Sequence, residues 1–239
     1  MNGHTTHRVP CPLCGEVQAV RVALTPIHLA EAGEERFEWV RCRECRLVRL
    51  ADPPDEEALR QYYGPEYLPH LRPGAWGRWA PLIRFAELNQ DRSRVRLAEV
   101  TVRDGGGGGA SEISVLDVGC GRPTFLRALV KKTGWRGTGL DTADTGWFHD
   151  PPDTWAGLHL RTGTLSDAQL PPDTFHLVTL WHVLEHLSNP REALSQALEI
   201  TRPGGAIVVE VPDYGSIPRK LQGNSWIGFD SPRHTVVFD

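Results

Sequence analysis

The sequence predicts an α/β fold, in which a mostly parallel sheet has helices on its flanks, preceded by a small N-terminal unit organised around cysteines. Strand-like and helix-like segments alternate between residues 113 and 211, as they do where right-handed crossovers join parallel strands. Four of the five cysteines form two C-x-x-C pairs within the first 45 residues. A chain of 239 residues has room for one α/β domain and a small appendage.

The two cysteine pairs are typical of a metal site. Cys11 with Cys14 and Cys42 with Cys45 each present two thiolates from one tight turn, and two such turns complete a closed tetrahedral site for Zn²⁺. Because no coordination position stays open, we expect a structural zinc ion that stabilises a zinc-ribbon-like unit too small for its own core. Paired free thiols or a redox pair are the alternative. The neighbouring arginines indicate a solvated basic face or, alternatively, contact with an anion: Arg41, Arg43, Arg46 and Arg49.

We expect three consecutive regions: the zinc-binding unit at 1–52, a helical linker or lid region at 53–104, and a Rossmann-like domain at 105–239. A run of five glycines, 105–109, indicates a flexible surface loop. The expected strands are 37–40, 47–50, 113–118, 137–141, 175–181 and 206–211, and the expected helices are 55–63, 85–102, 124–132 and 191–200.

The bulk properties narrow the class of protein. The formal net charge of −4 and the sequence pI near 6.2 give no overall attraction to nucleic acid or to anionic lipid. No apolar run approaches membrane-spanning length, and Met1 to His4 lack the apolar core of a secretion signal. The sequence therefore predicts a soluble cytoplasmic protein that contacts no membrane, and its charge does not favour nucleic acid as a partner.

A glycine turn follows the first strand of the third region. Asp117-Val118-Gly119-Cys120-Gly121 joins a strand to a helix, where glycines let a ligand approach the backbone and helix amides receive negative charge. Asp141 ends the next strand, where its carboxylate is placed to accept hydrogen bonds from ribose hydroxyls. The turn and the acid together predict a nucleoside at the strand ends.

These segments resemble the motifs of class I S-adenosylmethionine (SAM)-dependent methyltransferases over residues 113–212. The first motif is Val115 to Gly121, the second is Gly139 to Asp141, the fourth-strand signature is Leu170 to Leu180, and the turn before the fifth strand is Arg202 to Gly205. The whole arrangement, with a helix containing Tyr62 and Tyr63 between the cysteine unit and the SAM domain, also resembles a subset of small-molecule methyltransferases. Some of these act on deoxysugar nucleotides or other natural-product intermediates.

The resemblance implies SAM in the crevice above the strand ends. Gly119 and Gly121 are expected beside the methionine part of SAM, and Asp141 at the ribose. The remaining expected cofactor-binding residues are Asp117, Cys120 and Trp181, together with Leu165, Ser166 and Asp167 around the adenine. A Rossmann-like domain that binds a different nucleotide, or none, is the alternative.

Candidate catalytic residues follow the fourth strand, where the resemblance places the methyl acceptor. Methyl transfer is an in-line displacement, so the enzyme mainly aligns donor and acceptor, and a histidine suits the role of general base near neutral pH. His182, Glu185 and His186 supply such groups. Similar clusters approach a divalent ion in some ubiquinone-pathway and RNA-end O-methyltransferases, which is one alternative. The other is that Glu185 and His186 only fasten the turn to a neighbouring helix.

A second candidate patch lies beyond the fifth strand, in the region that covers the acceptor pocket in the family. Trp226 and Phe229 are expected as walls of this pocket, while Arg233 or His234 is expected to bind an anionic group or to take a proton. A surface loop held down by its aromatic side chains is the alternative.

The sequence reaches Asp239 before the last two strands of the seven-stranded sheet that the family has. We therefore expect these C-terminal strands to be missing and the fifth strand to have an exposed edge, which proteins normally cover. A truncated sequence, a second copy or partner subunit that covers the edge, and a degraded domain are the three explanations.

The predicted function is transfer of the SAM methyl group to a small-molecule acceptor, with a sugar-like or natural-product intermediate as the leading candidate. An RNA methyltransferase is one alternative, which the acidic balance opposes because phosphate contacts need clustered cations. A non-catalytic methyltransferase-like binding or scaffold subunit is the other. Neither the acceptor nor the accepting atom can be predicted from these residues.

Overall fold

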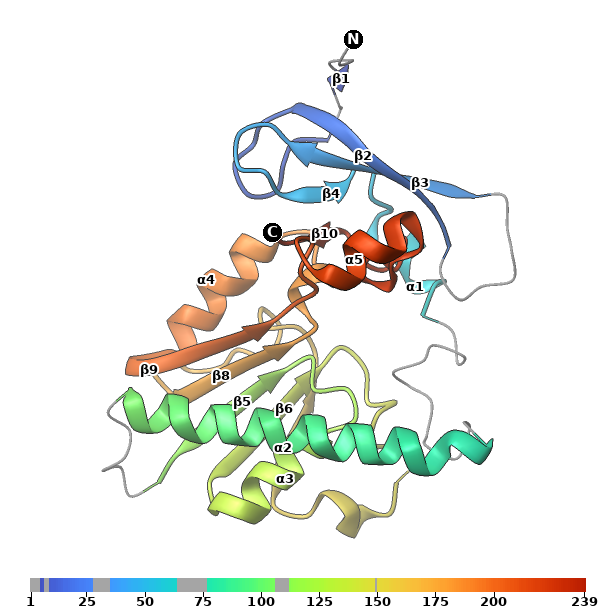
Figure 1. Ribbon diagram of the computed structural model, residues 1–239. Coiled ribbons are helices and arrows are strands. Elements are labelled where there is room, and N and C mark those ends of the chain that lie inside the picture. Colours follow the sequence, from blue (N-terminus) through green and yellow to red (C-terminus); the bar gives the residue numbers. More distant parts are fainter. Residues whose placement is uncertain (1–4, 7–8, 28–34, 64–76, 106–111, 149) are drawn as a thin grey trace. The chain divides into compact units, whose positions relative to one another are not determined.

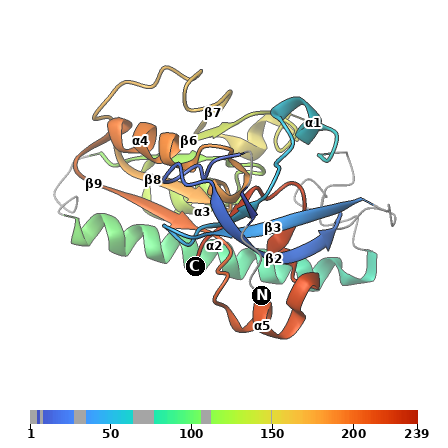
Figure 2. The ribbon, with the colours of Figure 1, turned by 90° about the horizontal axis from the view of Figure 1, so that it is seen from above.

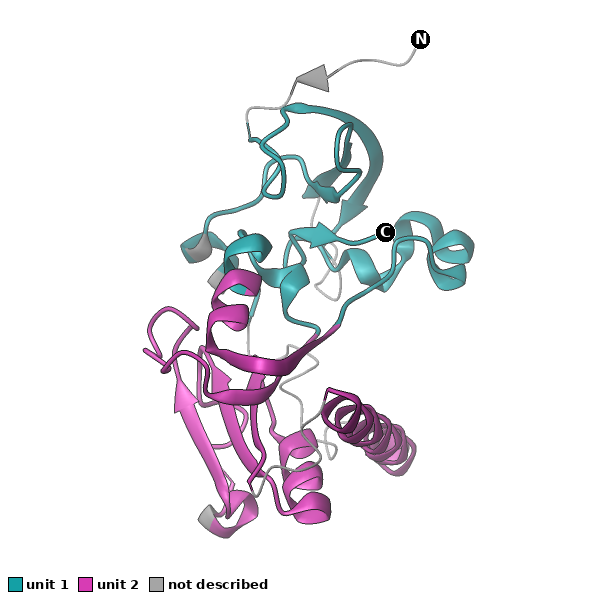
Figure 3. Ribbon diagram, turned by 90° about the vertical axis from the view of Figure 1, so that its left-hand side faces the viewer, with its two compact units in different colours: residues 1–64, 182–193, 210–239 teal, residues 65–181, 194–209 magenta. Residues whose placement is uncertain are grey.

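The computed structural model describes residues 5–6, 9–27, 35–63, 77–105, 112–148 and 150–239 (Figure 1). The chain divides into two compact units (Figure 3). Unit 1 contains residues 1–64, 182–193 and 210–239, and unit 2 contains residues 65–181 and 194–209. Each unit thus draws on segments that are distant in sequence, whereas the expected regions were consecutive; those regions stay a prediction. Most of the predicted glycine loop lies outside the described residues.

Unit 2 is built on a five-stranded sheet in the order β7-β6-β5-β8-β9. The strands are β5 (Ser114–Val118), β6 (Arg136–Asp141), β7 (Leu158–Thr162), β8 (Phe175–Trp181) and β9 (Thr201–Glu210). β5 pairs in parallel with both β6 and β8, and β6 pairs in parallel with β7. This arrangement confirms the Rossmann-like fold. Among the described strands β9 is the last on its side, and its cover by a partner or a second copy stays a prediction.

Two helices bury one face of this sheet. α2 (Ala80–Asp104) and α3 (Thr124–Thr133) lie on the same side in Figure 1. The core between them and the strands is apolar, and includes Val95, Ala98, Leu126, Leu129 and Leu177. α3 ends where Gly134 takes a left-handed conformation (φ 73°), which glycine adopts at little cost. The sequence predicted both helices, although α2 extends beyond the predicted ends.

Shorter elements complete the described chain. They are α1 (Glu56–Arg60), α4 (Pro190–Ile200) and α5 (Ile217–Gln222), with 3₁₀ turns η4 (Pro152–Trp155), η5 (Leu184–His186), η6 (Gly223–Ser225) and η7 (Ile227–Phe229). None of the described helices combines the length and the apolar character needed to cross a membrane.

Unit 1 contains an antiparallel sheet in the order β1-β2-β3-β4-β10. Its strands are β1 (Thr5–Thr6), β2 (Gln18–Pro26), β3 (Arg36–Cys42), β4 (Val48–Leu50) and β10 (Val236–Val237). The long neighbours β2 and β3 are seen side by side in Figure 2. β10 comes from the far end of the sequence, yet it pairs with β4 through Val236 opposite Arg49.

The C-terminal segment also supplies the core of unit 1. Phe229 is completely buried against the Trp39 ring, with 4.9 Å between ring centroids. The Trp39 indole Nε1 donates hydrogen bonds to Ser231 Oγ at 2.9 Å and to Thr25 Oγ1 at 3.1 Å. Residues around 226–237 therefore pack with the N-terminal strands in unit 1, which the sequence pattern did not indicate.

This packing predicts that removing the Phe229 ring lowers the stability of unit 1 as a whole, and does not only loosen a surface loop. Phe229→Ala should lower the free energy of unfolding by about 3–5 kcal/mol, since it removes a buried ring from a close-packed core. Ile227→Ala is the matched control because Ile227 is 56% exposed, and it should change stability by no more than about 0.5 kcal/mol. Urea unfolding measures both, and equal effects of the two substitutions would contradict the packing described.

Candidate functional site

The glycine turn and the acid after the second strand meet at the carboxyl ends of β5 and β6. Gly119 and Gly121 have positive φ angles of 65° and 47°, which side-chain-bearing residues rarely adopt. The Gly121 N–H donates a hydrogen bond to Asp141 Oδ2 at 2.7 Å. A Cβ added to Gly121 would have nothing within 4 Å, so there is open space beside this backbone. The structure thus brings together the predicted turn and the predicted ribose-binding acid.

Three other predicted cofactor residues are buried around the turn. Asp117 accepts a hydrogen bond from Thr179 Oγ1 at 2.6 Å, and burial raises the pKa of its carboxyl to about 7. Burial also raises the pKa of the Cys120 thiol, whose Sγ would be 2.8 Å from a Cβ on Gly139. Trp181 packs edge-on against Phe125 with 5.3 Å between ring centroids. These three buried side chains pack beneath the turn and do not line its surface.

The predicted adenine residues follow β7 at the same edge of the sheet. Leu165 is half-buried, while Ser166 and Asp167 are exposed. Asp167 Oδ2 accepts hydrogen bonds from the Thr164 N–H and hydroxyl, which lower the pKa of its carboxyl. Parallel α/β sheets bind ligands outside the carboxyl ends of their strands. The open space at Gly121, the carboxylate of Asp141 and these exposed side chains at that edge fit a nucleoside ligand such as SAM.

In unit 1, His182 is held between two carboxylates. Its Nδ1 lies 3.2 Å from Glu185 Oε1 and its Nε2 lies 2.8 Å from Glu210 Oε1. The hydrogen bonds with Glu185 and Glu210 raise the pKa of His182 to about 9. The residue has a left-handed backbone (φ 56°), a conformation that is uncommon outside glycine and concentrated at functional sites. Its side chain is 45% exposed, so it can still reach a ligand.

Glu185 and His186 are far less accessible. Glu185 is completely buried, and its Oε2 has no hydrogen-bond partner among the described residues. His186 Nδ1 lies 3.0 Å from the Tyr63 hydroxyl and 3.1 Å from the Arg233 carbonyl oxygen. Burial lowers the pKa of His186 to about 3, so this imidazole is neutral. An orphaned carboxylate oxygen beside a neutral imidazole is a costly arrangement that calls for a functional explanation.

His234 completes this cluster. Its ring packs edge-on against that of His186, with 4.6 Å between centroids, and its Nδ1 lies 2.8 Å from the Gly228 carbonyl oxygen. Potential ligand atoms of Glu185, His186 and His234 all lie within 4.8 Å of one another. If a divalent ion bound here, as in the alternative given by the sequence, its ligands would be Glu185, His186 and His234, with His234 in place of His182.

The other candidates beyond the fifth strand have structural partners. Arg233 forms an ion pair with Asp230, donating from Nε to Oδ2 at 2.9 Å, and its Nη1 donates to the Tyr62 carbonyl oxygen at 3.2 Å. Trp226 and Phe229 lie in the core of unit 1. These two side chains therefore hold the segment down, as in the alternative to a pocket wall given by the sequence.

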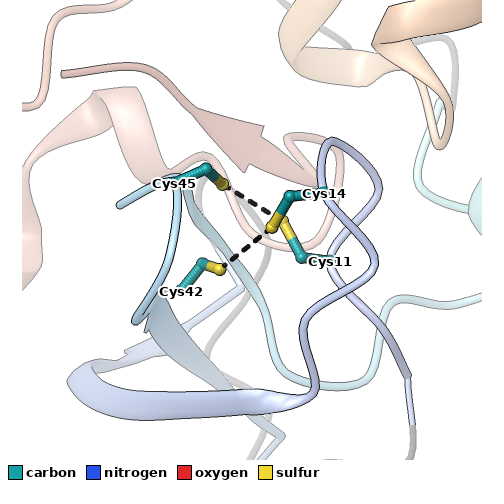
Figure 4. Close-up of side chains that lie close together, drawn as sticks. All are labelled: Cys11, Cys14, Cys42 and Cys45. Carbon is teal, nitrogen blue, oxygen red and sulfur yellow. Dashed lines mark hydrogen bonds between the residues drawn. The ribbon is translucent and has the colours of Figure 1, made fainter.

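The four cysteines of the predicted zinc site converge in unit 1 (Figure 4). Cys11 Sγ lies 3.5 Å from Cys45 Sγ, and Cys14 Sγ lies 3.5 Å from Cys42 Sγ. Thiolates on one tetrahedral zinc ion are separated by about 3.8 Å when each Zn–S bond is about 2.3 Å. The geometry is therefore compatible with a zinc-binding unit.

The residue after each cysteine pair has a positive φ angle: 79° for Gly15 and 66° for Arg46. Both turns thus have the same shape at this point. A backbone hydrogen bond at Glu16 lowers the pKa of Cys14 to about 7, whereas burial raises the pKa of Cys42 and of Cys45. Arg49, expected on a solvated face, is instead buried, and its guanidinium donates to the carbonyl oxygens of Leu50 and Val9.

Sequence reasoning missed three residues of the histidine cluster. The sequence placed Tyr63 only in an expected helix, 55–63, whereas the structure ends that helix, α1, at Arg60. Asp230 was not singled out. Glu210 had a usable signal, because it is the one acid in the apolar segment from Ala206 to Val211. A lone acid at the end of an otherwise apolar strand segment is a candidate site residue, and this one contacts His182.

Comparison with known proteins gives consistent matches. A family model described as a methyltransferase domain matches residues 71–239. The chain is 30% identical over 124 residues to a malonyl-[acyl-carrier protein] O-methyltransferase of Serratia marcescens, covering 52% of this chain and 47% of the relative. It is 33% identical over 141 residues to a ubiquinone biosynthesis O-methyltransferase of Photobacterium profundum, covering 54% and 55%. The chain thus spans about half the length of these curated relatives.

Among solved structures, the plantazolicin methyltransferase BpumL, in complex with a pentazolic desmethyl analogue and S-adenosylhomocysteine, is similar to this chain. The sequence identity is 15% and the TM-score is 0.49, with 74% of this chain and 71% of that chain covered.

Proposed function

This chain belongs to the class I SAM-dependent methyltransferases, and from that premise we propose that it transfers the methyl group of SAM to a small-molecule acceptor. The observation that carries the proposal is the hydrogen bond between Gly121 and Asp141, which joins the glycine turn to the ribose-binding acid at the carboxyl edge of a parallel sheet. SAM supplies an electrophilic methyl group on its sulfonium.

On the donor side, the chain's own residues bind and orient the nucleoside. The carboxylate of Asp141 is the proposed acceptor of hydrogen bonds from the ribose hydroxyls, and the open space at Gly121 admits the methionine part. Leu165, Ser166 and Asp167 surround the adenine in this proposal, and Asp117, Cys120 and Trp181 hold the turn in place.

On the acceptor side, His182 is the proposed proton acceptor. It follows β8 directly in the chain, and it is the most exposed of the four candidates His182, Glu185, His186 and His234. Glu185 orients its ring, while His186 and His234 position Glu185 and the surrounding loop. A proton must leave when a hydroxyl or carbon acid is methylated, and a histidine in hydrogen-bond reach of the acceptor can take it.

A small acceptor agrees with the relatives, whose names refer to ubiquinone biosynthesis and to malonyl-[acyl-carrier protein]. The proposed acceptor is a sugar-like or other natural-product intermediate, supported by the resemblance of the four-cysteine unit and of the segment with Tyr62 and Tyr63 that follows it. An RNA acceptor has less support, because the charge balance is acidic and Arg49 is buried.

The first experiment tests cofactor binding. Titration calorimetry with S-adenosylhomocysteine should show one binding event, which Asp141→Asn weakens at least about tenfold because the ribose hydroxyls lose a charged acceptor. Asp173→Asn is the control: Asp173 is exposed with φ 54°, a conformation that asparagine tolerates, so affinity should not change. Absence of heat from folded, zinc-loaded protein would instead favour a binding or scaffold subunit.

We also propose that the cysteine cluster holds one structural zinc ion. Elemental analysis of purified protein should find about one zinc per chain, as expected for a closed four-thiolate site. Cys14→Ser should lose the metal and destabilise unit 1, because ion binding supplies part of its folding free energy. Cys120→Ala removes a thiol outside the cluster and should retain the zinc. A Cys14→Ser protein with its full zinc content would refute the assignment.

The third experiment concerns the pH dependence of catalysis. The pKa of His182 is raised to about 9 by hydrogen bonds with Glu185 and Glu210, so below that pH the ring is protonated and cannot accept a proton. The rate should therefore rise with pH up to about 9. Glu210→Gln removes one negative charge, lowers this pKa and should move the midpoint to lower pH by about one unit or more.

The matched control for this profile is Glu199→Gln, since Glu199 is an exposed acid on α4. Its pH–rate curve should superimpose on that of the unaltered protein. Identical midpoints for Glu210→Gln and the unaltered protein would exclude His182 as the proton acceptor.

A further inference from the structure

One arginine of unit 1 is buried and bonded only to backbone oxygens. Arg49 lies on β4 with 2% of its surface exposed. Its guanidinium donates hydrogen bonds to three carbonyl oxygens, those of Val9 at 2.7 Å, Leu50 at 2.9 Å and Ala51 at 3.3 Å. Its Nε is buried without a hydrogen-bond partner among the described residues. Carbonyl oxygens carry no net charge, so this buried cation still needs a counter-charge.

Acidic side chains do not provide that counter-charge. In the described part of the first sheet and its turns, the ion pairs involve three other arginines, which are Arg21, Arg41 and Arg46. A buried charge without a partner is costly, because the protein interior screens it much less than water does. The negative charge that balances Arg49 must therefore come from another kind of group.

Arg49 lies on the face of the sheet that contacts the cysteines. Side chains two positions apart in an extended segment share a face, so Arg49 is on the side of Leu47, which packs with Cys11 and Cys42. Val236 pairs with Arg49 across the sheet and belongs to that same cluster. Burial lowers the pKa of the Arg49 guanidinium, whereas the negative charge of the four cysteines raises it. Four thiolates outweigh one Zn²⁺, so an occupied site has the excess negative charge that this cation lacks.

We propose that Arg49 supplies the counter-charge of the zinc site and that its positive charge helps to hold the metal. The inference rests on the proposed structural zinc ion. Because the guanidinium also bonds to Val9, two residues before Cys11, it joins the segment before the first cysteine pair to the strand after the second. Removing one partner of a buried charge pair leaves the other uncompensated. A neutral residue at position 49 should therefore weaken zinc binding although all four cysteines are present.

Arg49→Gln and Arg49→Lys separate the charge from the hydrogen bonds. Both side chains have a donor for a backbone carbonyl oxygen, but only lysine retains the positive charge. In competition with a chromophoric zinc chelator, Arg49→Gln should bind zinc at least about tenfold more weakly than the unaltered chain, whereas Arg49→Lys should stay within about threefold. Arg43→Gln is the matched control, because Arg43 is exposed beside Cys42 and solvent screens its charge, so the affinity should not change.

Cobalt substitution provides a spectroscopic readout that a purely structural role would not change. The ligand-field bands of Co²⁺ report the tetrahedral geometry, while the charge-transfer band from thiolate to metal responds to charges near the sulfur atoms. Loss of a nearby cation raises the energy of the thiolate electrons. The charge-transfer band of Arg49→Gln should therefore move to longer wavelength with the ligand-field bands in place, and Arg49→Lys should leave both unchanged.

Three results would overturn the proposal: equal zinc affinity in Arg49→Gln and the unaltered chain, an equal loss in Arg49→Lys and Arg49→Gln, or an unmoved charge-transfer band in Arg49→Gln. Should Arg49→Gln not fold, Arg49→Lys decides alone, since a need for charge predicts retained zinc and a need for the forked guanidinium predicts its loss. An unaltered chain that binds neither zinc nor cobalt would instead refute the metal site itself, and the role of Arg49 with it.

Discussion

The parallel pairing of β5 with β6 is the constraint on which the donor side depends. The register places Val118 opposite Leu140, so the two strands end at the same level. The Leu140 carbonyl oxygen can then accept from the amides of Gly119 and Cys120, at 2.7 and 3.1 Å, and Asp141 can accept from Gly121. The turn is thus held to the neighbouring strand by its own backbone. A shift of register by one residue would separate the acid from the turn and remove the site, because side chains alternate between faces.

Each of the two units has a buried acid among its candidate site residues. Asp117 lies in apolar surroundings, where ionisation is costly, and Thr179 is its nearest hydrogen-bonding partner. In unit 1, Glu185 is also completely buried, with one oxygen bonded to His182 and the other without a partner among the described residues. Both acids lie within segments proposed to have a function, Asp117 in the glycine-turn motif and Glu185 between His182 and His186. Proteins retain such unfavourable groups where they orient another residue or await a ligand.

Local sequence patterns were sufficient to predict the glycine turn, the acid after the next strand and the convergence of the cysteine pairs. Each is defined by residues within a few positions of one another, and the glycines and cysteines impose strong local requirements. The strand β7 was missed because its residues are mostly exposed or half-buried and lack a clear apolar alternation. The pairing of β10 with β4, the bond from Trp39 to Ser231 and the contact of Glu210 with His182 connect distant parts of the chain. Periodicity carries no information about such partners, so the charge state of His182 could not be predicted either.

The return of the C-terminal segment to the first sheet has a consequence for the order of events during synthesis. Trp39 and β4 emerge from the ribosome almost two hundred residues before Ser231, Phe229 and β10, which cover them. A metal ion can join the two cysteine turns early, but the apolar face of the nascent sheet stays open until these later residues have been made. The closing of so long a loop is slow, and exposed strands invite association with other chains in the interval. The strands made first therefore stay open to such association until the C-terminal residues have been made.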